Sequence, residues 1–238
     1  MSAPPRFFFV HLQKTGGTAL FQRLVECFGP DAVYPTPDDR GNVAAVLDVR
    51  HLVAELDRLG DQIRVVTGHF PLCVTEHLDG PFTTFTVLRD PVERTLSLLR
   101  RRQVIEPRFA GFELEQIYED PSLEHIIRNH MVKMLSLTPA EMGDVPLTVP
   151  VTFDAARLER AKQNLTTIDV VGLQERFDDL CAELERRFGW DLGAPRFANR
   201  TPHQPVPDAL RERIAADNQM DVDLYQFAVG LVDERAGG

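Results

Sequence analysis

Cysteine is scarce in this 238-residue chain, and long apolar segments are missing from it. Its three cysteines are widely spaced, odd in number and form no CxxC pair, which disfavours both a disulfide framework and a zinc site. No segment approaches the ~18 continuous apolar residues of a membrane span. The apolar run at residues 7–10 is shorter than the ~7-residue core of a signal peptide. These absences predict a cytoplasmic protein with no integral membrane contact.

Positive charge is also in the minority. The chain has 26 Lys+Arg against 36 Asp+Glu, a net charge of −10 at pH 7. Nucleic acid carries the same sign, which disfavours a large phosphate-tracking surface, although one local basic pocket can still hold a small anion. The 43% apolar and 26% charged residues are typical of a soluble globular protein. The length fits a single domain over residues 1–238.

Short apolar runs alternate with amphipathic segments along most of the chain. This alternation predicts an α/β fold, with a parallel sheet flanked by helices and a helical carboxyl-terminal part. Helices are also expected to begin at Thr18 and after Asp90, and a loop is expected at residues 34–42. The predicted strands are residues 7–12, 63–67, 83–88 and 168–173, and further predicted helices are 48–59, 122–135, 154–164, 175–188 and 207–233.

The first segment whose residues could bind a ligand joins the first predicted strand to the first predicted helix. It consists of Lys14, Thr15, Gly16, Gly17 and Thr18. Glycines let the backbone approach an anion closely, and the N–H groups of a helix N-terminus point toward it. The lysine adds a charge, and the threonine hydroxyls can donate to phosphate oxygens. A Walker loop places its lysine after the glycines, so this is not one, and a plain strand-to-helix turn explains the segment equally well.

The second segment follows the third predicted strand. Arg89 lies at the carboxyl end of that strand, where open parallel sheets bind ligands. Asp90 suits a helix N-cap, Pro91 the first helical position and Glu93 a capping box. Ser97 lies two helical turns along, so its hydroxyl and Arg89 can converge on one anion. Taken alone, an Arg–Asp pair beside a capped helix is the simpler interpretation.

Taken together, the two segments resemble a known family. The lysine-first glycine loop and residues 89–97 (RDPVERTLS) resemble the 5′-phosphosulfate loop and the 3′-phosphate motif of sulfotransferases, which use 3′-phosphoadenosine 5′-phosphosulfate (PAPS). Residues 11–18 (HLQKTGGT) look most like the branch that includes the carbohydrate 2-O-sulfotransferases, although Gln13 stands where that family usually has proline. Residues 68–71 (GHFP) match a motif of that branch with a histidine base, and residues 172–177 (GLQERF) are similar to a further recurring segment.

The resemblance implies a P-loop-like sulfotransferase fold and transfer of the sulfuryl group of PAPS to a hydroxyl of a carbohydrate, glycolipid or small metabolite, without a metal ion. By the same resemblance, Lys14 stabilises the leaving phosphate and His69 is the general base. The backbone amides of residues 16–18 hold the 5′-phosphate. The remaining residues that the resemblance assigns to PAPS are Arg89 and Ser97 at the 3′-phosphate and Arg200 and Thr201 in a flap over it.

Several other side chains are expected to have no part in the site. His11 is expected to be structural packing, and His125 and His130 are expected at the surface. The three arginines at residues 100–102 point in different directions around a helix, which predicts a solvated helix end.

Two alternatives stay open. One is a small-molecule kinase on a related phosphate-binding fold, which needs Mg²⁺ and carboxylate ligands. The other is a non-catalytic nucleotide-binding protein. For a sulfotransferase, the net charge of −10 predicts a neutral or weakly charged acceptor.

Overall fold

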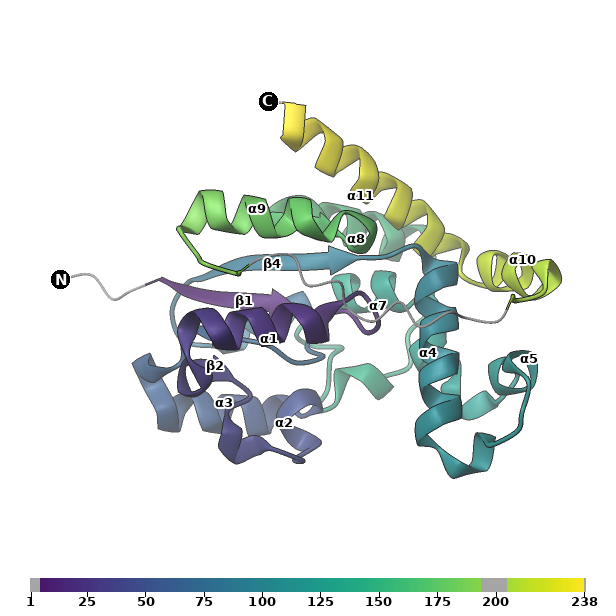
Figure 1. The fold of residues 1–238 in the computed structure, drawn as a ribbon, viewed down its shortest axis with the longest axis horizontal. Helices are drawn as coiled ribbons and strands as arrows, with labels where there is room; N and C mark the ends of the chain where they lie inside the picture. The colour runs from purple at the N-terminus through teal and green to yellow at the C-terminus, as the bar shows by residue number, and fades with distance from the viewer. Residues whose placement is uncertain (1–4, 194–204, 238) are drawn as a thin grey trace.

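The centre of the computed structural model is a sheet of five strands in the order β2-β3-β1-β4-β5 (Figure 1). The model describes residues 5–193 and 205–237. Every neighbouring pair of strands is parallel, so the predicted parallel sheet is confirmed. The strands are β1 (Arg6–Val10), β2 (Val33–Tyr34), β3 (Val65–Val66), β4 (Phe82–Leu88) and β5 (Val170–Leu173).

Helices flank this sheet, and the carboxyl-terminal part of the chain is mainly helical. Short 3₁₀ turns connect many of them. No helix in the described ranges is long and apolar enough to cross a bilayer. The α-helices of the described residues are α1 (Gly17–Phe28), α2 (Ala44–Leu47), α3 (Val49–Leu59), α4 (Pro91–Ile105), α5 (Leu114–Tyr118), α6 (Glu124–Ile127), α7 (His130–Ser136), α8 (Ala155–Thr167), α9 (Phe177–Phe188), α10 (Asp208–Asp217) and α11 (Gln219–Gly237).

The strands contribute side chains to two separate cores. Phe7 and Phe9 of β1 pack on one face of the sheet with residues of α1 and α9. Phe8 and Val10 pack on the other face with residues of α3, α7, α8 and α11. All four side chains are at most 2% exposed. Since burial of each contributes about 1.5–3 kcal/mol, β1 is a rigid base for the loop that follows it.

The chemistry-bearing segments meet at one edge of the sheet. Because all strands are parallel, their carboxyl ends lie together, and Val10 at the end of β1 is in register with Thr86 of β4. The Thr86 hydroxyl donates to the Val10 carbonyl at 2.8 Å, which ties the two strand ends. Figure 1 shows α4 at the end of the sheet toward which the arrows of β1 and β4 point.

The start of α4 follows the predicted cap only in part. Asp90 is the N-cap, its carboxylate accepts from the Glu93 N–H at 2.9 Å, and Pro91 is the first helical residue. The Glu93 carboxylate does not close a capping box; it accepts from Arg211 of α10 at 2.5 Å. The predicted Glu93 contact is therefore wrong, because a basic side chain distant in sequence competes for the carboxylate.

Two predicted helices are interrupted. The segment 122–135 divides into α6 and α7 at Asn129, which has a left-handed φ of 41°. The segment 207–233 divides into α10 and α11 at Asn218. The Asn129 N–H donates to the Asn218 side chain at 2.8 Å, so each break supports the other. Local periodicity carries no signal for such a tertiary contact. Elements as short as β2, α2 and α5 also contain too few residues to show a hydrophobic period.

Candidate active site

A cavity of about 470 Å³ opens at the carboxyl edge of the sheet. Its walls come from the loop after β1, the start of α1, the residues that follow β3, β4 and β5, and one face of α4. Segments far apart in the sequence thus share one space. The lining residues are His11, Gln13, Lys14, Gly16, Gly17, Thr18, Ala19, His69, Arg89, Ser97, Leu98, Arg101, Arg102, Ile105 and Gln174.

Most of the predicted site residues are therefore brought together. Thr15 is the exception among the described residues: its side chain is fully buried and its hydroxyl donates to the Leu12 carbonyl at 2.9 Å. The prediction that this hydroxyl donates to a phosphate is wrong, because its proton is already used inside the loop. Arg200 and Thr201 lie outside the described residues.

The loop after β1 is held by side chains at four consecutive residues, 11–14. These bonds fix the backbone around Lys14, whose φ of 68° lies in the left-handed region. A loop held in this way meets its ligand already ordered, which lowers the entropy cost of binding. The bonds run from His69 Nδ1 to the His11 carbonyl (3.1 Å), from Thr15 Oγ1 to the Leu12 carbonyl (2.9 Å), from the Gln13 N–H to His130 Nε2 (3.2 Å) and from Arg89 Nη1 to the Lys14 carbonyl (3.1 Å).

The start of α1 offers an uncapped helix end to the cavity. Its N-cap is Gly16, in a left-handed conformation with φ 92°, and no side chain caps it. The first turn holds no acidic residue, so its free N–H groups and the helix dipole favour an anion. At Gly17 a Cβ would lie 1.9 Å from His11 Nε2, so only glycine fits beneath the histidine ring.

His69 has one ring nitrogen fixed as a donor. A carbonyl oxygen only accepts, so the Nδ1 that contacts the His11 carbonyl must carry the proton, and Nε2 of the neutral ring keeps its lone pair. Burial lowers the pKa of His69 below its usual 6.5, with a smaller lowering by the charge of Lys14, while the bond to His11 opposes them. The backbone N–H of His69 donates to the Val46 carbonyl at 2.8 Å. A neutral, oriented imidazole at pH 7 suits a general base.

The charge inside the cavity is opposite to that of the whole chain. Its charged lining residues, among those that the structure describes, are all basic: Lys14, Arg89, Arg101 and Arg102. Burial lowers the pKa of Lys14, and the charges of Arg101, Arg89 and Arg102 lower it further. Arg102 forms an ion pair at 2.6 Å with Glu106, whereas Arg101 forms none with any described residue. A cluster of like charges of this kind favours the binding of an anion.

Arg89 has donor capacity to spare. Its Nη1 holds the Lys14 carbonyl, but its Nε is buried without a hydrogen-bond partner among the described residues. A buried donor left unsatisfied costs about 1–3 kcal/mol, which a bound oxyanion would remove. Ser97 lies on the neighbouring wall, and Arg101 and Ile105 follow it at successive four-residue steps on the same face of α4.

The expectations for three basic side chains are incomplete. Arg101 is exposed at the helix end, as predicted, and Arg102 is partly exposed, but both also line the cavity; the spacing of four from Ser97 to Arg101 was the available signal. His11 does pack, stacked on the Phe9 ring at 5.0 Å, and it also lines the cavity with its ring 4.5 Å from that of His69.

The two histidines expected at the surface differ. His125 on α6 is exposed, as predicted. His130 at the start of α7 is fully buried beneath the loop, so its predicted surface position is wrong. The break at Asn129 separates the two residues into different helices, and this turns His130 into the interior.

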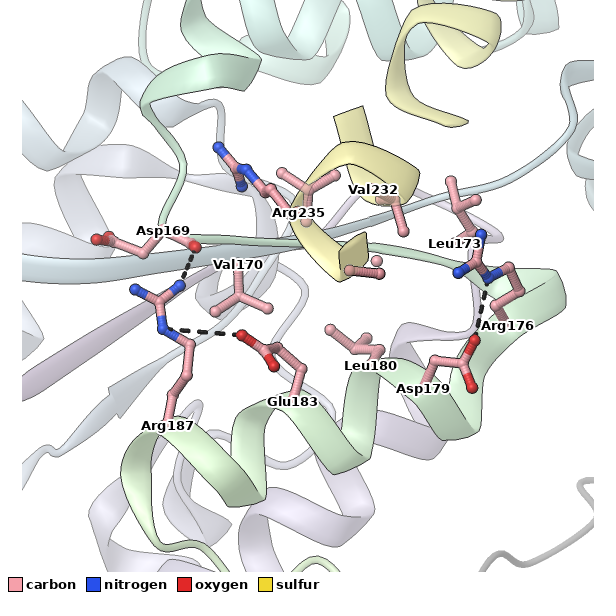
Figure 2. Close-up of a pocket in the computed structure, with 13 residues that line it drawn as sticks. Asp169, Val170, Leu173, Arg176, Asp179, Leu180, Glu183, Arg187, Val232 and Arg235 are labelled. Atoms are coloured by element: carbon pink, nitrogen blue, oxygen red, sulfur yellow. Dashed lines mark hydrogen bonds and ion pairs between the residues drawn. The ribbon is translucent and has the colours of Figure 1, made fainter. Parts of the chain in front are cut away.

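A second cavity, of about 140 Å³, lies between β5, α9 and α11, and its basic side chains already have partners (Figure 2). Arg176 pairs with Asp179, and Arg187 contacts Glu183 and the Asp169 carbonyl. The third arginine, at residue 235, donates to backbone carbonyls. Every arginine on its wall is thus already satisfied.

Comparison with models of known protein families and with curated proteins finds no match to this chain. Within residues 5–193 and 205–237, no group of three or more His, Cys, Asp or Glu side chains could hold a metal ion.

Proposed function

We propose that this protein is a PAPS-dependent sulfotransferase with a P-loop-like sulfotransferase fold. One observation carries the proposal: the lysine-first glycine loop, His69 and the Arg89–Ser97 pair line a single cavity whose charged side chains, among the described residues, are all basic. Each motif alone has an ordinary structural explanation. Their convergence supplies an anion cradle, a general base and a second phosphate site in one space.

The donor fits the cavity in two places. The free N–H groups at the start of α1, at residues 16–18, suit the 5′-phosphate. The guanidinium of Arg89 and the hydroxyl of Ser97, which both line the cavity, suit the 3′-phosphate. The proposal keeps Arg200 and Thr201 as additional 3′-phosphate contacts.

The reaction assigns complementary roles to His69 and Lys14. His69 Nε2 takes the proton of the acceptor hydroxyl while its oxygen forms a bond to the sulfur. The bond from sulfur to the 5′-phosphate oxygen breaks, and its electron pair remains on that oxygen, where the Lys14 ammonium stabilises it. The products are a sulfate ester and 3′,5′-adenosine bisphosphate. Holding both groups at one cavity supplies the in-line positioning that such a transfer needs.

The acceptor is an alcohol that is neutral or carries little charge. Arg101, with no ion-pair partner among the described residues, tolerates one anionic group beside the reacting hydroxyl. A polyanionic chain would extend beyond the cavity over a protein with a net charge of −10. Efficient sulfation of heparin-like polymers at physiological salt would show this part of the proposal to be wrong.

Thermal unfolding with and without nucleotide tests the proposal before an acceptor is known. 3′,5′-Adenosine bisphosphate at ~100 times its Kd stabilises a folded protein by about 2.7 kcal/mol. For a chain of this length the expected rise in Tm is roughly 5 to 10 °C. The shift should persist in EDTA. Stabilisation by ATP with Mg²⁺ and none by the bisphosphate would favour the kinase alternative.

A screen with labelled PAPS against panels of alcohols, glycans and metabolites then identifies the acceptor. Formation of a labelled sulfate ester separates an enzyme from a non-catalytic nucleotide-binding protein.

A further inference from the structure

His130 lies directly beneath the Lys14 loop and belongs to a different part of the chain. It is the first residue of α7, its side chain is fully buried, and its Nε2 lies 3.2 Å from the Gln13 backbone nitrogen. The Gln13 N–H can only donate, so Nε2 must present a lone pair and His130 must be neutral. Burial holds the pKa of His130 well below 6.5, which keeps that lone pair available.

The position of His130 is set by α11. The buried Asp221 carboxylate accepts from the backbone N–H groups of Met131 at 3.1 Å and Val132 at 2.8 Å, and so caps α7. The Asn129 side chain accepts from the Asp221 N–H at 3.1 Å. The starts of α7 and α11 are therefore locked together although some ninety residues separate them in the sequence.

The hydrogen bond supplies a constraint at residue 13 that glutamine itself does not. A proline at this position would fix its own backbone torsion but would have no N–H. Gln13 lacks that restriction and has the N–H that His130 binds. The backbone of residue 13 is thus held by a tertiary contact, whereas a proline ring would hold it locally.

We propose that His130 is a positioning residue: it transmits the placement of α7, set by α11, to the backbone of Gln13 and so holds Lys14 in place opposite His69. His130 does not touch the reacting atoms in this account. Its effect on turnover rests on the proposed sulfotransferase function, whereas its effect on the loop does not.

Amide hydrogen exchange in the ligand-free full chain tests the loop contact. His130→Asn introduces a polar side chain that is too short to reach Gln13, whereas His130→Gln places its amide oxygen near the position of Nε2. We expect about tenfold faster exchange at Gln13 in His130→Asn and near wild-type exchange in His130→Gln.

Lys133→Met is the matched control. Lys133 is also buried on α7, but it donates to the Leu147 carbonyl at 2.7 Å and makes no hydrogen bond to the loop. Its variant is expected to lower the Tm without changing exchange at residues 11–18. Equal exchange at Gln13 in His130→Asn and wild type, or equal acceleration in Lys133→Met, would overturn the positioning role.

Nucleotide binding and turnover separate this inference from the proposed function. We expect His130→Asn to lower kcat more than tenfold, with His130→Gln recovering most of it. If the wild-type protein does not bind 3′,5′-adenosine bisphosphate while the exchange results hold, the proposed function fails and the loop contact stands. If the nucleotide binds and turnover of His130→Asn equals that of wild type, the positioning role fails and the proposed function stands.

Discussion

His69 Nδ1 lies 3.1 Å from the carbonyl oxygen of His11, and this bond decides which nitrogen of His69 can act as a base. The proton on Nδ1 leaves Nε2 free, and the same bond ties the residue after β3 to the loop after β1. One hydrogen bond thus orients the proposed base and helps to hold the loop that carries Lys14.

His69→Ala should lower turnover by about 10²–10⁴-fold, because it removes the general base. Affinity for 3′,5′-adenosine bisphosphate should fall far less than turnover, since no proposed phosphate contact is lost and only one of the four bonds that hold the Lys14 loop is removed. Steady-state kinetics and calorimetry on the same preparation give both values. Unaltered turnover would remove His69 from the mechanism.

The pH dependence of turnover should follow the lowered pKa of His69. The base acts in its neutral form, and burial lowers its pKa below 6.5, so activity should be fully present above pH 6.5 and fall only as the pH drops through the lower folded value. A pH–rate profile from pH 4 to pH 8 (a range of roughly two units either side of an ordinary histidine) measures this. An acid limb centred above 6.5 contradicts the assignment.

Gly17→Ala should disrupt the phosphate cradle. Its Cβ would lie 1.9 Å from His11 Nε2, so the histidine ring or the start of α1 must move. We expect nucleotide affinity to fall by at least about tenfold, as for the loss of one charge-assisted hydrogen bond. Gly230→Ala on α11 is the control, because nothing lies within 4 Å of a Cβ there. Equal affinity in both variants would mean that residue 17 has no part in the site.

Much of this framework could be predicted from sequence because the signals are local. The apolar run of β1, the glycines at the start of α1 and the cap at Asp90 each encode their own structure within a few residues. The position of His130 could not be predicted, because the break that buries it depends on a contact between Asn129 and Asn218.

The roles within the site were harder to predict than the site itself. Thr15 lies in a segment that the sequence assigned to phosphate binding, yet its hydroxyl turns inward to its own loop. Arg101 lies outside both assigned segments, yet its side chain lines the cavity. Which way a side chain faces depends on the backbone torsions of the loop and on the rotation of α4, and residue type alone does not specify either.

Ser97 should discriminate between PAPS and adenosine phosphosulfate, which differ only by the 3′-phosphate. Ser97→Ala should weaken PAPS by roughly threefold to tenfold and leave adenosine phosphosulfate unchanged, as for a hydrogen bond of about 0.5–1.5 kcal/mol. Arg89→Ala should weaken PAPS more, and it should also weaken adenosine phosphosulfate, because Arg89 holds the Lys14 carbonyl. Calorimetry with both nucleotides decides this. Equal losses for both donors in Ser97→Ala would place the 3′-phosphate elsewhere.

Arg101→Gln should shift the alkaline limb of activity. Lys14 acts in its charged form, and Arg101 is the strongest of the charges that lower its pKa. Removing that charge raises the pKa of Lys14, so activity should persist to higher pH. Arg100→Gln, which changes a neighbour outside the cavity, should leave the limb in place. Identical shifts in both variants would show a general effect of net charge.

The measurement that tests the central claim most directly is calorimetric titration of the wild-type protein, in EDTA, with 3′,5′-adenosine bisphosphate and with 5′-AMP. The two ligands share the 5′-phosphate and differ by the 3′-phosphate that Arg89 and Ser97 are proposed to hold. A charge-assisted bond of about 1.5–3 kcal/mol predicts binding of the bisphosphate tighter by roughly ten- to more than a hundredfold. Equal affinity for the two nucleotides, or no binding of either, would contradict the assignment of this cavity to PAPS.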